Sequence, residues 1–558
     1  MATVDSALPA PPQSNEPNGV PTGSDVQPAI GRVLLQMAIV ASVLIGLGVQ
    51  FTTYLNHDIG WILYSAKWLL HGASFGKEII AVNPPLIWYL SAPITAIADV
   101  AGLQAATAFR LVIAAIAMIT LWTNSHRWLP PALARSSWRT AFLAVGCFVL
   151  FVDSQRDFGQ REYLTFLFTL PYVFLVAARL QHNALQPTVG GSFAIGVLAG
   201  IGVAFKPHLL AVPFCIELTA WLRNRRVRQL LRPEVAGGAV AIVLYGVAVL
   251  TCFPAYTDEW IPVFRQLYWG FENSWFYVFW KMRLELILLA ATGMMLWRSQ
   301  TRPLSRLLFA QAIGFAIACM AQKKAYSYHV FPLRATLCLL LLALAFDFAG
   351  ERIANLRGRK LAAVGLLGLF LLTTSLSRGF AWYSLHGQLL AGEVYERVDS
   401  KVPPRLTPYQ VQTQLIALLN RYSSDDRFLA LSTHPHPGFP TALYVAPDWC
   451  SHTNSRIFLP AIAKLRELHD DSLADQLSLA EQLERKLTLD DLRQQPAVVL
   501  LDAAPIKHAL GRMPFDMLSF YLEEQQFAAE WSRYREAAPI GPYRVFVRQS
   551  DDTIARRN

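Results

Sequence analysis

The stretch VLLQMAIVASVLIGLGV, residues 33–49, decides the fold class, because it holds no charged side chain and is nearly long enough to cross a bilayer. No charged residue occurs between Arg32 and Asp58. Similar apolar runs recur as far as Leu376, and the short polar segments between them hold nearly all the lysines and arginines of this region. The pattern predicts an all-α polytopic membrane bundle of about eleven transmembrane helices plus juxtamembrane helices.

The composition of the whole chain agrees with a membrane protein. Hydrophobic residues make up 54% of the 558 residues and charged residues 16%, against roughly 25% charged in an ordinary soluble domain. The net charge of +10 does not indicate nucleic acid as a partner, because the basic residues cluster in loops such as 223–228 rather than along one face. Residues 1–30 contain no Lys or Arg and are predicted to be a disordered cytoplasmic tail.

The basic residues predict which loops of the transmembrane domain, residues 31–378, share a face. The cytoplasmic loops are taken to be the basic ones, 126–139, 223–232, 298–306 and 351–360. The opposite face then receives 51–85, 153–161, 206–208, 254–281, 322–329 and everything after Arg378. One apolar run cannot be a full crossing, and we expect it to be 86–102, because Pro84, Pro85 and Pro93 interrupt it.

The C-terminal part, residues 379–558, is predicted to be a soluble extracytoplasmic α/β domain, because its apolar residues become periodic rather than continuous. The histidine-proline motif HPHP, residues 434–437, has no third ligand nearby, so we interpret it as a loop rather than a metal site. The predicted helices are 407–421 and 458–468, and the predicted strands are 427–431, 497–501 and 543–547.

The first outer loop carries an acidic residue just beyond the first apolar run, in NHDIGW at 56–61. An amphipathic segment follows, and the loop closes with NPPL at 83–86. This arrangement resembles the GT-C superfamily of membrane glycosyltransferases, and in particular the protein O-mannosyltransferases and the lipid A aminoarabinose transferases. The chain departs from them in two places: Ile59 stands where a second acid is frequent, and Asn83 stands where a charged residue often precedes the two prolines.

The resemblance implies an inverting glycosyltransferase that moves a sugar from a polyprenyl-phosphate carrier to an acceptor hydroxyl at the outer face of the membrane. The acceptor would be a glycan, a lipid or a protein, and the location the bacterial inner membrane with a periplasmic C-terminal domain. The family's candidate general base corresponds to Asp58. Chemistry favours the same role, since the attacking hydroxyl must lose a proton and a positioned carboxylate contributes roughly 10²–10⁴-fold. The alternative is that Asp58 caps a helix at the interface.

No cofactor is certain from the sequence, and a divalent metal is possible, because some GT-C enzymes bind one and others do not. His57, beside the predicted base, is assigned to substrate binding, with a metal ligand as the less favoured alternative. The charged loop 153–161 holds Asp157, which best matches a second active-site acid of the family and is predicted to be catalytic; a helix cap is the alternative.

Charges inside the apparent span that follows are costly unless they are paired, so Arg161 and Glu162 are expected to form a mutual pair or to bind a ligand. Arg161 is assigned to phosphate binding and Glu162 to substrate binding. A further outward cation, Lys206, is assigned to the same phosphate site, with snorkelling to the interface as the alternative.

The basic segment QKKAYSYH, residues 322–329, lies on the side that the charge rule leaves poor in cations. An anionic lipid phosphate explains this, with Lys323 and Lys324 as its partners and Tyr328 and His329 binding substrate. Similar basic loops hold the carrier phosphate in the resembled family. Contact with anionic membrane lipids is the alternative.

The long segment 254–281 mixes aromatic and charged residues, and Arg265 and Trp269 within it are predicted to bind substrate by hydrogen bonding and stacking. An interfacial aromatic belt is the commoner cause of such a pattern. An oligosaccharide polymerase or ligase with lipid-diphosphate donors would depend on Arg265 and His329 more than on Asp58. A transporter or a scaffold of envelope assembly also stays open, although no duplicated half is found in the sequence.

Overall fold

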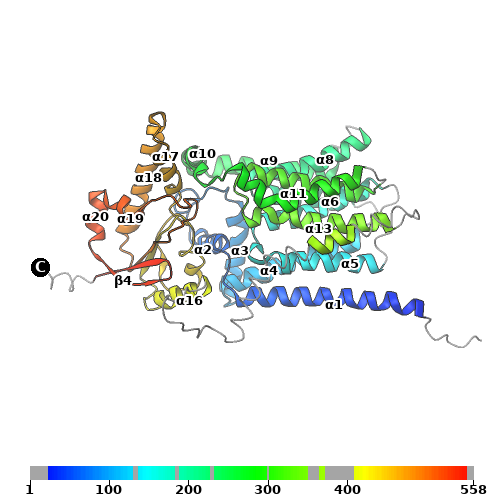
Figure 1. Ribbon diagram of the computed structural model, residues 1–558, viewed down its shortest axis with the longest axis horizontal. Coiled ribbons are helices and arrows are strands. Elements are labelled where there is room, and N and C mark those ends of the chain that lie inside the picture. The colour runs from blue at the N-terminus through cyan, green and yellow to red at the C-terminus, as the bar shows by residue number, and fades with distance from the viewer. Residues whose placement is uncertain are drawn as a thin grey trace, which may run out of the picture.

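Helices form most of the described chain and are arranged as a bundle with a smaller domain, which contains the sheet, at one end (Figure 1). Six helices of the described part are long and apolar enough to cross a membrane. A mostly helical membrane protein with a C-terminal sheet is therefore found as predicted, whereas the predicted number of spans is not confirmed. The structure is a computed structural model, which describes residues 23–129, 136–181, 188–225, 231–297, 301–349, 363–370 and 408–549.

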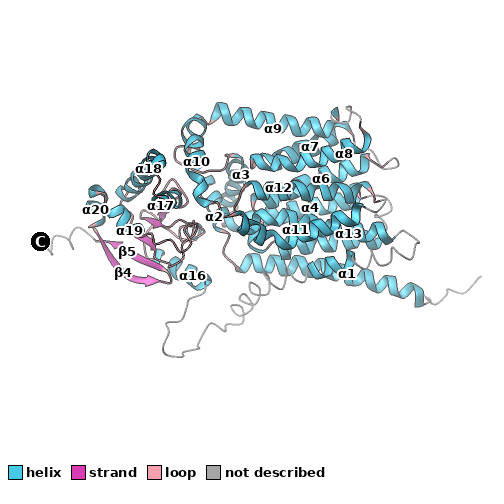
Figure 2. Ribbon diagram, turned by 45° about the horizontal axis from the view of Figure 1, so that its top comes forward, coloured by secondary structure: helices cyan, strands magenta, loops and turns pink. Residues whose placement is uncertain are grey.

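The candidate membrane-spanning helices lie roughly parallel, and shorter helices run beside them (Figure 2). A further helix, α11 (Trp275–Trp297), has the necessary length, but Lys281, Arg283 and Glu285 interrupt its apolar character. The six are α1 (Gly23–Thr52), α4 (Ala105–Thr123), α6 (Arg161–Arg179), α9 (Pro233–Cys252), α12 (Pro303–Ala321) and α13 (Ser327–Ala349). The shorter helices are α3 (Leu86–Val100), α5 (Ser136–Cys147), α7 (Val189–Ala204) and α8 (Ala211–Asn224).

Two details of the bundle differ from the sequence predictions. Helix α1 begins at Gly23, so the end of the predicted disordered tail is helical; extending a formed helix adds one hydrogen bond per residue and costs little. Helix α3 contains Pro93 without being broken by it. Its 15 residues rise roughly 22 Å, which is short of a hydrocarbon core of about 30 Å and agrees with the prediction that this run is not a full crossing.

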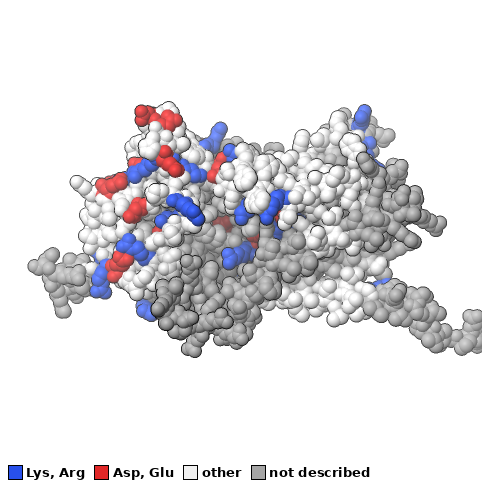
Figure 3. Space-filling view, viewed as in Figure 1, with Lys and Arg blue, Asp and Glu red and all other residues white. Residues whose placement is uncertain are grey.

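Charged side chains are unevenly distributed over the surface. Figure 3 shows Lys, Arg, Asp and Glu spread over the C-terminal domain and few of them on the described surface of the bundle. The bundle instead exposes large apolar residues, including Val243 and Leu244 of α9, which is buried only to a small extent. Such a surface is suited to lipid rather than to water.

The C-terminal domain is built on a five-stranded sheet in the order β2-β1-β3-β5-β4. Strand β1 is parallel to β2 and β3, and β5 is antiparallel to β3 and β4. The strands are β1 (Arg427–Leu431), β2 (Asp448–Trp449), β3 (Val498–Asp502), β4 (Tyr534–Ile540) and β5 (Tyr543–Arg548). The helices are α16 (Pro408–Leu419), α17 (Leu459–Leu468), α18 (Ala474–Arg493), α19 (Met517–Leu522) and α20 (Gln525–Trp531).

The three predicted strands and two predicted helices of this domain are confirmed within a few residues. The polar α18 and the mostly exposed β4 were not predicted from the sequence. Strand β4 shows no apolar period, because it lies at the sheet edge and has no fully buried residue. Helix α18 does carry Leu477, Ala480, Leu483 and Leu487 at helical spacing, and this signal was overlooked.

Helix α2 (His57–Leu70) joins the domain to the bundle. Its Trp61 ring lies 5.1 Å from the ring of Phe439 in the C-terminal domain. A Cβ atom at Gly60 would lie 2.9 Å from the Cα of Pro440, so this close packing requires a glycine. The domain is therefore seated directly on the first outer loop.

The segment predicted as a long loop, 254–281, is mostly helical and contains a π-helical turn (Ala255–Trp260) and α10 (Ile261–Leu267). The Trp260 ring stacks on Phe458 with 6.4 Å between centroids, and its Nε1 donates to the carbonyl of Gly76 at 2.7 Å. Trp260 thus attaches the C-terminal domain to the bundle. This role differs from both interpretations of the segment, sugar stacking and an interfacial aromatic belt.

Candidate functional site

A cavity of about 690 Å³ lies where the bundle meets the C-terminal domain. It is lined from the start of α2, the segment before α6, the connection between α7 and α8, the segment 264–281 and the hairpin between α12 and α13. Loops of the C-terminal domain complete it. The charge rule predicts that these loops share one face of the membrane, and the structure gathers them at one end of the bundle.

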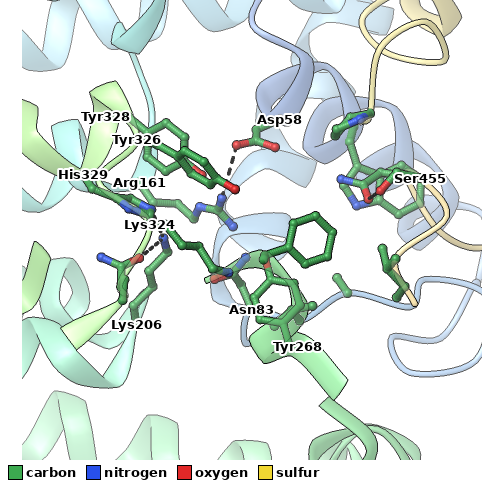
Figure 4. Close-up of a pocket in the computed structure, with 18 of the residues that line it drawn as sticks. Asp58, Asn83, Arg161, Lys206, Tyr268, Lys324, Tyr326, Tyr328, His329 and Ser455 are labelled. Atoms are coloured by element: carbon green, nitrogen blue, oxygen red, sulfur yellow. Dashed lines mark hydrogen bonds and ion pairs between the residues drawn. The ribbon is translucent and has the colours of Figure 1, made fainter. Parts of the chain in front are cut away.

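Asp58 is positioned by the first turn of α2. The side chain of Asn56, not of Asp58, caps this helix and accepts the Asp58 backbone N–H at 2.9 Å. The carboxylate is therefore left to line the cavity, with its Oδ2 3.8 Å from Nη2 of Arg161 and its Oδ1 3.8 Å from Nε2 of His57 (Figure 4). The structure thus excludes the capping alternative for Asp58.

The pKa of Asp58 lies below its ordinary value, although burial acts to raise it. His57, Arg161 and Lys206 outweigh the burial through their charges, and Tyr328 adds a hydrogen bond to the carboxylate. The positive end of the α2 dipole acts in the same direction. Asp58 is consequently an anion at neutral pH and is available to accept a proton.

Arg161 and Glu162 do not pair with each other, so the first of the two expectations for these residues, a mutual pair, is wrong. Adjacent residues of a helix point in different directions, so they cannot face one another. Glu162 lies outside the cavity lining and holds Lys206, whose Nζ is 2.5 Å from Oε1 of Glu162 and 3.0 Å from Oε1 of Gln322. Nε2 of His329 lies 3.4 Å from the same ammonium group. Glu162 therefore orients a cavity cation rather than contacting the cavity.

The two neighbouring lysines of the hairpin point to different places. Lys323 is absent from the cavity lining, and its Nζ pairs with Glu272 at 3.1 Å. Lys324 lines the cavity, with its Nζ 3.4 Å from the ring centroid of Tyr268. Lys323 and Ala325 both have positive φ, and this local backbone turn separates the two side chains.

Lys324 is only 7% exposed, and no carboxylate lies within 4 Å of its ammonium group among the residues that the structure describes. Burial lowers its pKa to about 7, despite the opposing charges of Glu272 and Asp58. An unpaired buried cation is unfavourable. A bound anion in the cavity would supply the missing partner.

Asp157 does not line the cavity, contrary to its predicted catalytic role. It is 4% exposed, and its Oδ1 accepts a hydrogen bond from Oγ of Ser327 at 2.7 Å. This bond ties the loop before α6 to the first residue of α13. Asp157 therefore shapes the hairpin that carries Lys324.

The remaining predicted residues line the cavity; these are His57, Tyr328, His329, Arg265 and Trp269. Tyr328 contacts Asp58 directly, whereas His329 lies beside Lys206. Within the described ranges, no group of three or more His, Cys, Asp or Glu side chains is placed to hold a metal ion.

Several lining residues were missed in the sequence. Tyr268 and Tyr326 lie in the predicted basic and aromatic segments, but nothing in their spacing separates them from their neighbours. His434, interpreted only as part of a loop, lies three residues beyond the end of β1, and ligands of α/β domains bind beyond the carboxyl ends of parallel strands. His508 has no sequence signal, because only the packed domain brings it to the cavity.

A search against protein-family models finds no match for the chain, and a search of curated protein sequences finds none either.

Proposed function

We propose that the protein is an inverting glycosyltransferase of GT-C type that uses a polyprenyl-phosphate sugar as donor. The observation that carries this proposal is the shared cavity, in which the carboxylate of Asp58 meets the cations Arg161, Lys206 and Lys324. Inverting transfer from a phosphate needs a base for the acceptor hydroxyl and positive charge for the leaving phosphate. The carboxylate and the cations line the same cavity.

In the proposed reaction, Asp58 accepts the proton of the acceptor hydroxyl while its oxygen attacks the anomeric carbon. The bond from that carbon to the phosphate oxygen breaks, and the phosphate leaves with the electron pair. Arg161, Lys206 and Lys324 stabilise the charge that develops on it. The leaving group needs no proton, so a single carboxylate is sufficient.

Arg161 gives donor binding a second effect. It stabilises the Asp58 anion before a donor binds, which makes Asp58 a weak base. A donor phosphate that engages Arg161 shares its charge, and the pKa of Asp58 then rises toward the range that is efficient for proton transfer. The base would thus be strengthened only when the donor is present.

The surroundings of the cavity support a lipid donor. Tyr277 and Lys281 of α11 line the cavity, while Trp275, Phe276 and Trp280 of the same helix are exposed. A phosphate inside the cavity would therefore lie beside an apolar, aromatic surface that suits a membrane interface. The charge rule favours the outer face of the membrane for this end of the bundle. The resemblance to GT-C enzymes supports a bacterial inner membrane, with the C-terminal domain in the periplasm.

The experiment is transfer of labelled sugar from polyprenyl-phosphate sugars by the full chain in proteoliposomes. Asp58→Asn should lower transfer by roughly 10²–10⁴-fold, the usual contribution of a general base. Asp99→Asn is the matched control, because Asp99 is exposed, pairs with Lys67 and lies outside the cavity. Full transfer by Asp58→Asn would end the proposed mechanism.

A lipid-diphosphate polymerase or ligase is the second candidate, because Arg265 and His329 line the same cavity. That reaction predicts activity with lipid-diphosphate sugars. It also predicts that Arg265→Ala is the more damaging variant and that Asp58→Asn remains active. The same proteoliposomes, supplied with each class of donor, separate the two reactions.

A further inference from the structure

The C-terminal domain forms one wall of the cavity, which we call the neutral wall, and its chemistry differs from that of the bundle. Its polar lining residues are Thr433, His434, Asn454, Ser455 and His508. Among the lining residues that the described part of this domain contributes, none is Lys, Arg, Asp or Glu. The charged lining residues of the cavity all come from the bundle; they are Asp58, Arg156, Arg161, Lys206, Arg265, Glu272, Lys281 and Lys324.

The two histidines of the neutral wall are uncharged at neutral pH. Burial lowers the pKa of His508 to about 4 and holds that of His434 well below its ordinary value. A neutral imidazole presents one N–H donor and one nitrogen acceptor. With the hydroxyl and amide groups beside them, they form a surface of mixed donors and acceptors without net charge.

Hydrogen bonds within the domain fix the neutral wall. Oγ of Ser432 donates to Oδ2 of Asp502 at 3.0 Å, and Oγ1 of Thr433 donates to the backbone carbonyl of His508 at 2.6 Å. These bonds join the segment that follows β1 to the last residue of the parallel strand β3 and to the loop beyond it. His434 is held as well, because its Nδ1 accepts the backbone N–H of His436 at 3.0 Å, which leaves the proton on Nε2.

The neutral wall begins beside the proposed base. The ring of His434 lies 4.2 Å from that of His57, the residue before Asp58, and 4.9 Å from that of His508. His508 also reaches the bundle, since its Nε2 is 3.3 Å from the hydroxyl of Tyr326. In the view of Figure 4, Asp58 lies between Arg161 and Lys206 on one side and Ser455 on the other.

We infer that the neutral wall is the acceptor subsite and that it binds the hydroxyl groups of an uncharged carbohydrate; this inference rests on the proposed function. Sugar hydroxyls both donate and accept hydrogen bonds, as this wall requires. The wall itself offers no cation to a carboxylate or phosphate on the acceptor, since the cations of the cavity, Arg156 near His57 among them, belong to the bundle. An acceptor held on this wall presents its hydroxyl to Asp58 from the side away from the cations, and inversion requires attack opposite the leaving phosphate.

The test measures binding of two probes to the full chain in nanodiscs: octyl mannoside for the neutral wall and a polyprenyl-phosphate mannose for the cations. His434→Ala and His508→Ala should each weaken octyl mannoside binding about tenfold, the effect of one lost hydrogen bond, and leave donor binding unchanged. His508→Gln keeps a neutral donor and acceptor and should restore binding. His469→Ala is the matched control, because His469 is exposed and outside the cavity.

Octyl glucuronide and a threonine-containing peptide complete the panel. Tighter binding of either than of octyl mannoside would overturn the inference, and so would equal losses of donor and mannoside binding in the histidine variants. Mannoside binding without donor binding would refute the proposed transferase and keep the neutral wall as a carbohydrate site. Donor binding without mannoside binding would refute the acceptor subsite alone.

Discussion

The cavity and the interior of the bundle both hold buried charges, and their difference separates a candidate site from a structural cluster. In the interior, Arg334 of α13 is 2% exposed and lies 3.2 Å from Asp153 and 3.3 Å from Glu285. Each acid there faces the same guanidinium, and none of the three residues lines the cavity. Burial and charge are therefore not sufficient to indicate chemistry.

The cavity differs in being accessible and incompletely paired. Lys206 forms an ion pair with Glu162, and Arg161 forms one with Asp58, whereas the ammonium group of Lys324 faces aromatic rings. In the interior cluster each charge has an opposite charge within 4 Å, whereas Lys324 of the cavity has no carboxylate that close among the described residues, and we propose that a bound anion supplies it. Three predictions, in order of decreasing effect, test this distinction.

Breaking the interior cluster should affect stability most. Arg334→Met leaves two carboxylates without their partner, and loss of one member of a buried ion pair costs about 3–5 kcal/mol. Thermal unfolding of the purified protein measures the loss. Adding Asp153→Asn and Glu285→Gln to Arg334→Met removes all three charges and should recover most of it. An unchanged unfolding temperature for Arg334→Met would show that the cluster is not a stabilising element.

Substitutions of the two hairpin lysines should have different effects on donor affinity and on stability. Lys324→Met removes a buried cation that faces the cavity, so donor affinity should fall about tenfold or more while stability stays level or rises. Lys323→Met removes only a surface pair with Glu272, worth about 0–1 kcal/mol, and should leave donor affinity unchanged. Donor binding and thermal unfolding of both variants check this. Equal losses of affinity would contradict the assignment of Lys324 as the phosphate partner.

The sequence predicts the features that depend on local pattern. Apolar runs give the helical bundle, short β-like runs give three strands of the sheet, and loop charge gives the grouping of segments around the cavity. It cannot separate Lys323 from Lys324, because a positive φ in the hairpin, not composition, directs their side chains. His508 also escapes prediction, since it reaches Tyr326 only through the packing of two domains.

Asp157 shows the opposite kind of error, in which a local pattern predicts a catalytic residue that the structure places outside the cavity. A dense run of charge before a span indicates a site, yet Asp157 bonds Ser327 and Asp153 bonds Arg334, both across the bundle. The partner residues lie more than 150 positions away in the sequence. The sequence alone cannot distinguish a charged side chain that pairs with a distant residue from one that faces a ligand.

The smallest predicted effect is a pH dependence that belongs to Lys324. Burial lowers its pKa to about 7, and Arg161 acts in the same direction. A donor phosphodiester keeps its negative charge across the neutral range and favours the protonated ammonium, so binding takes up a proton above pH 7. Donor affinity should therefore be constant below pH 7 and fall by up to about tenfold per pH unit above it.

Lys324→Arg tests the origin of this slope, because a guanidinium stays protonated throughout the range. Its donor affinity should lose the dependence between pH 7 and pH 9, whereas Lys323→Arg should retain the wild-type slope. A slope that persists in Lys324→Arg would assign the titration to another group. A flat profile in the wild-type protein would mean that Lys324 is already protonated before the donor binds. Its burial without a carboxylate partner would then have to be offset by the aromatic rings of Tyr268 and Phe271.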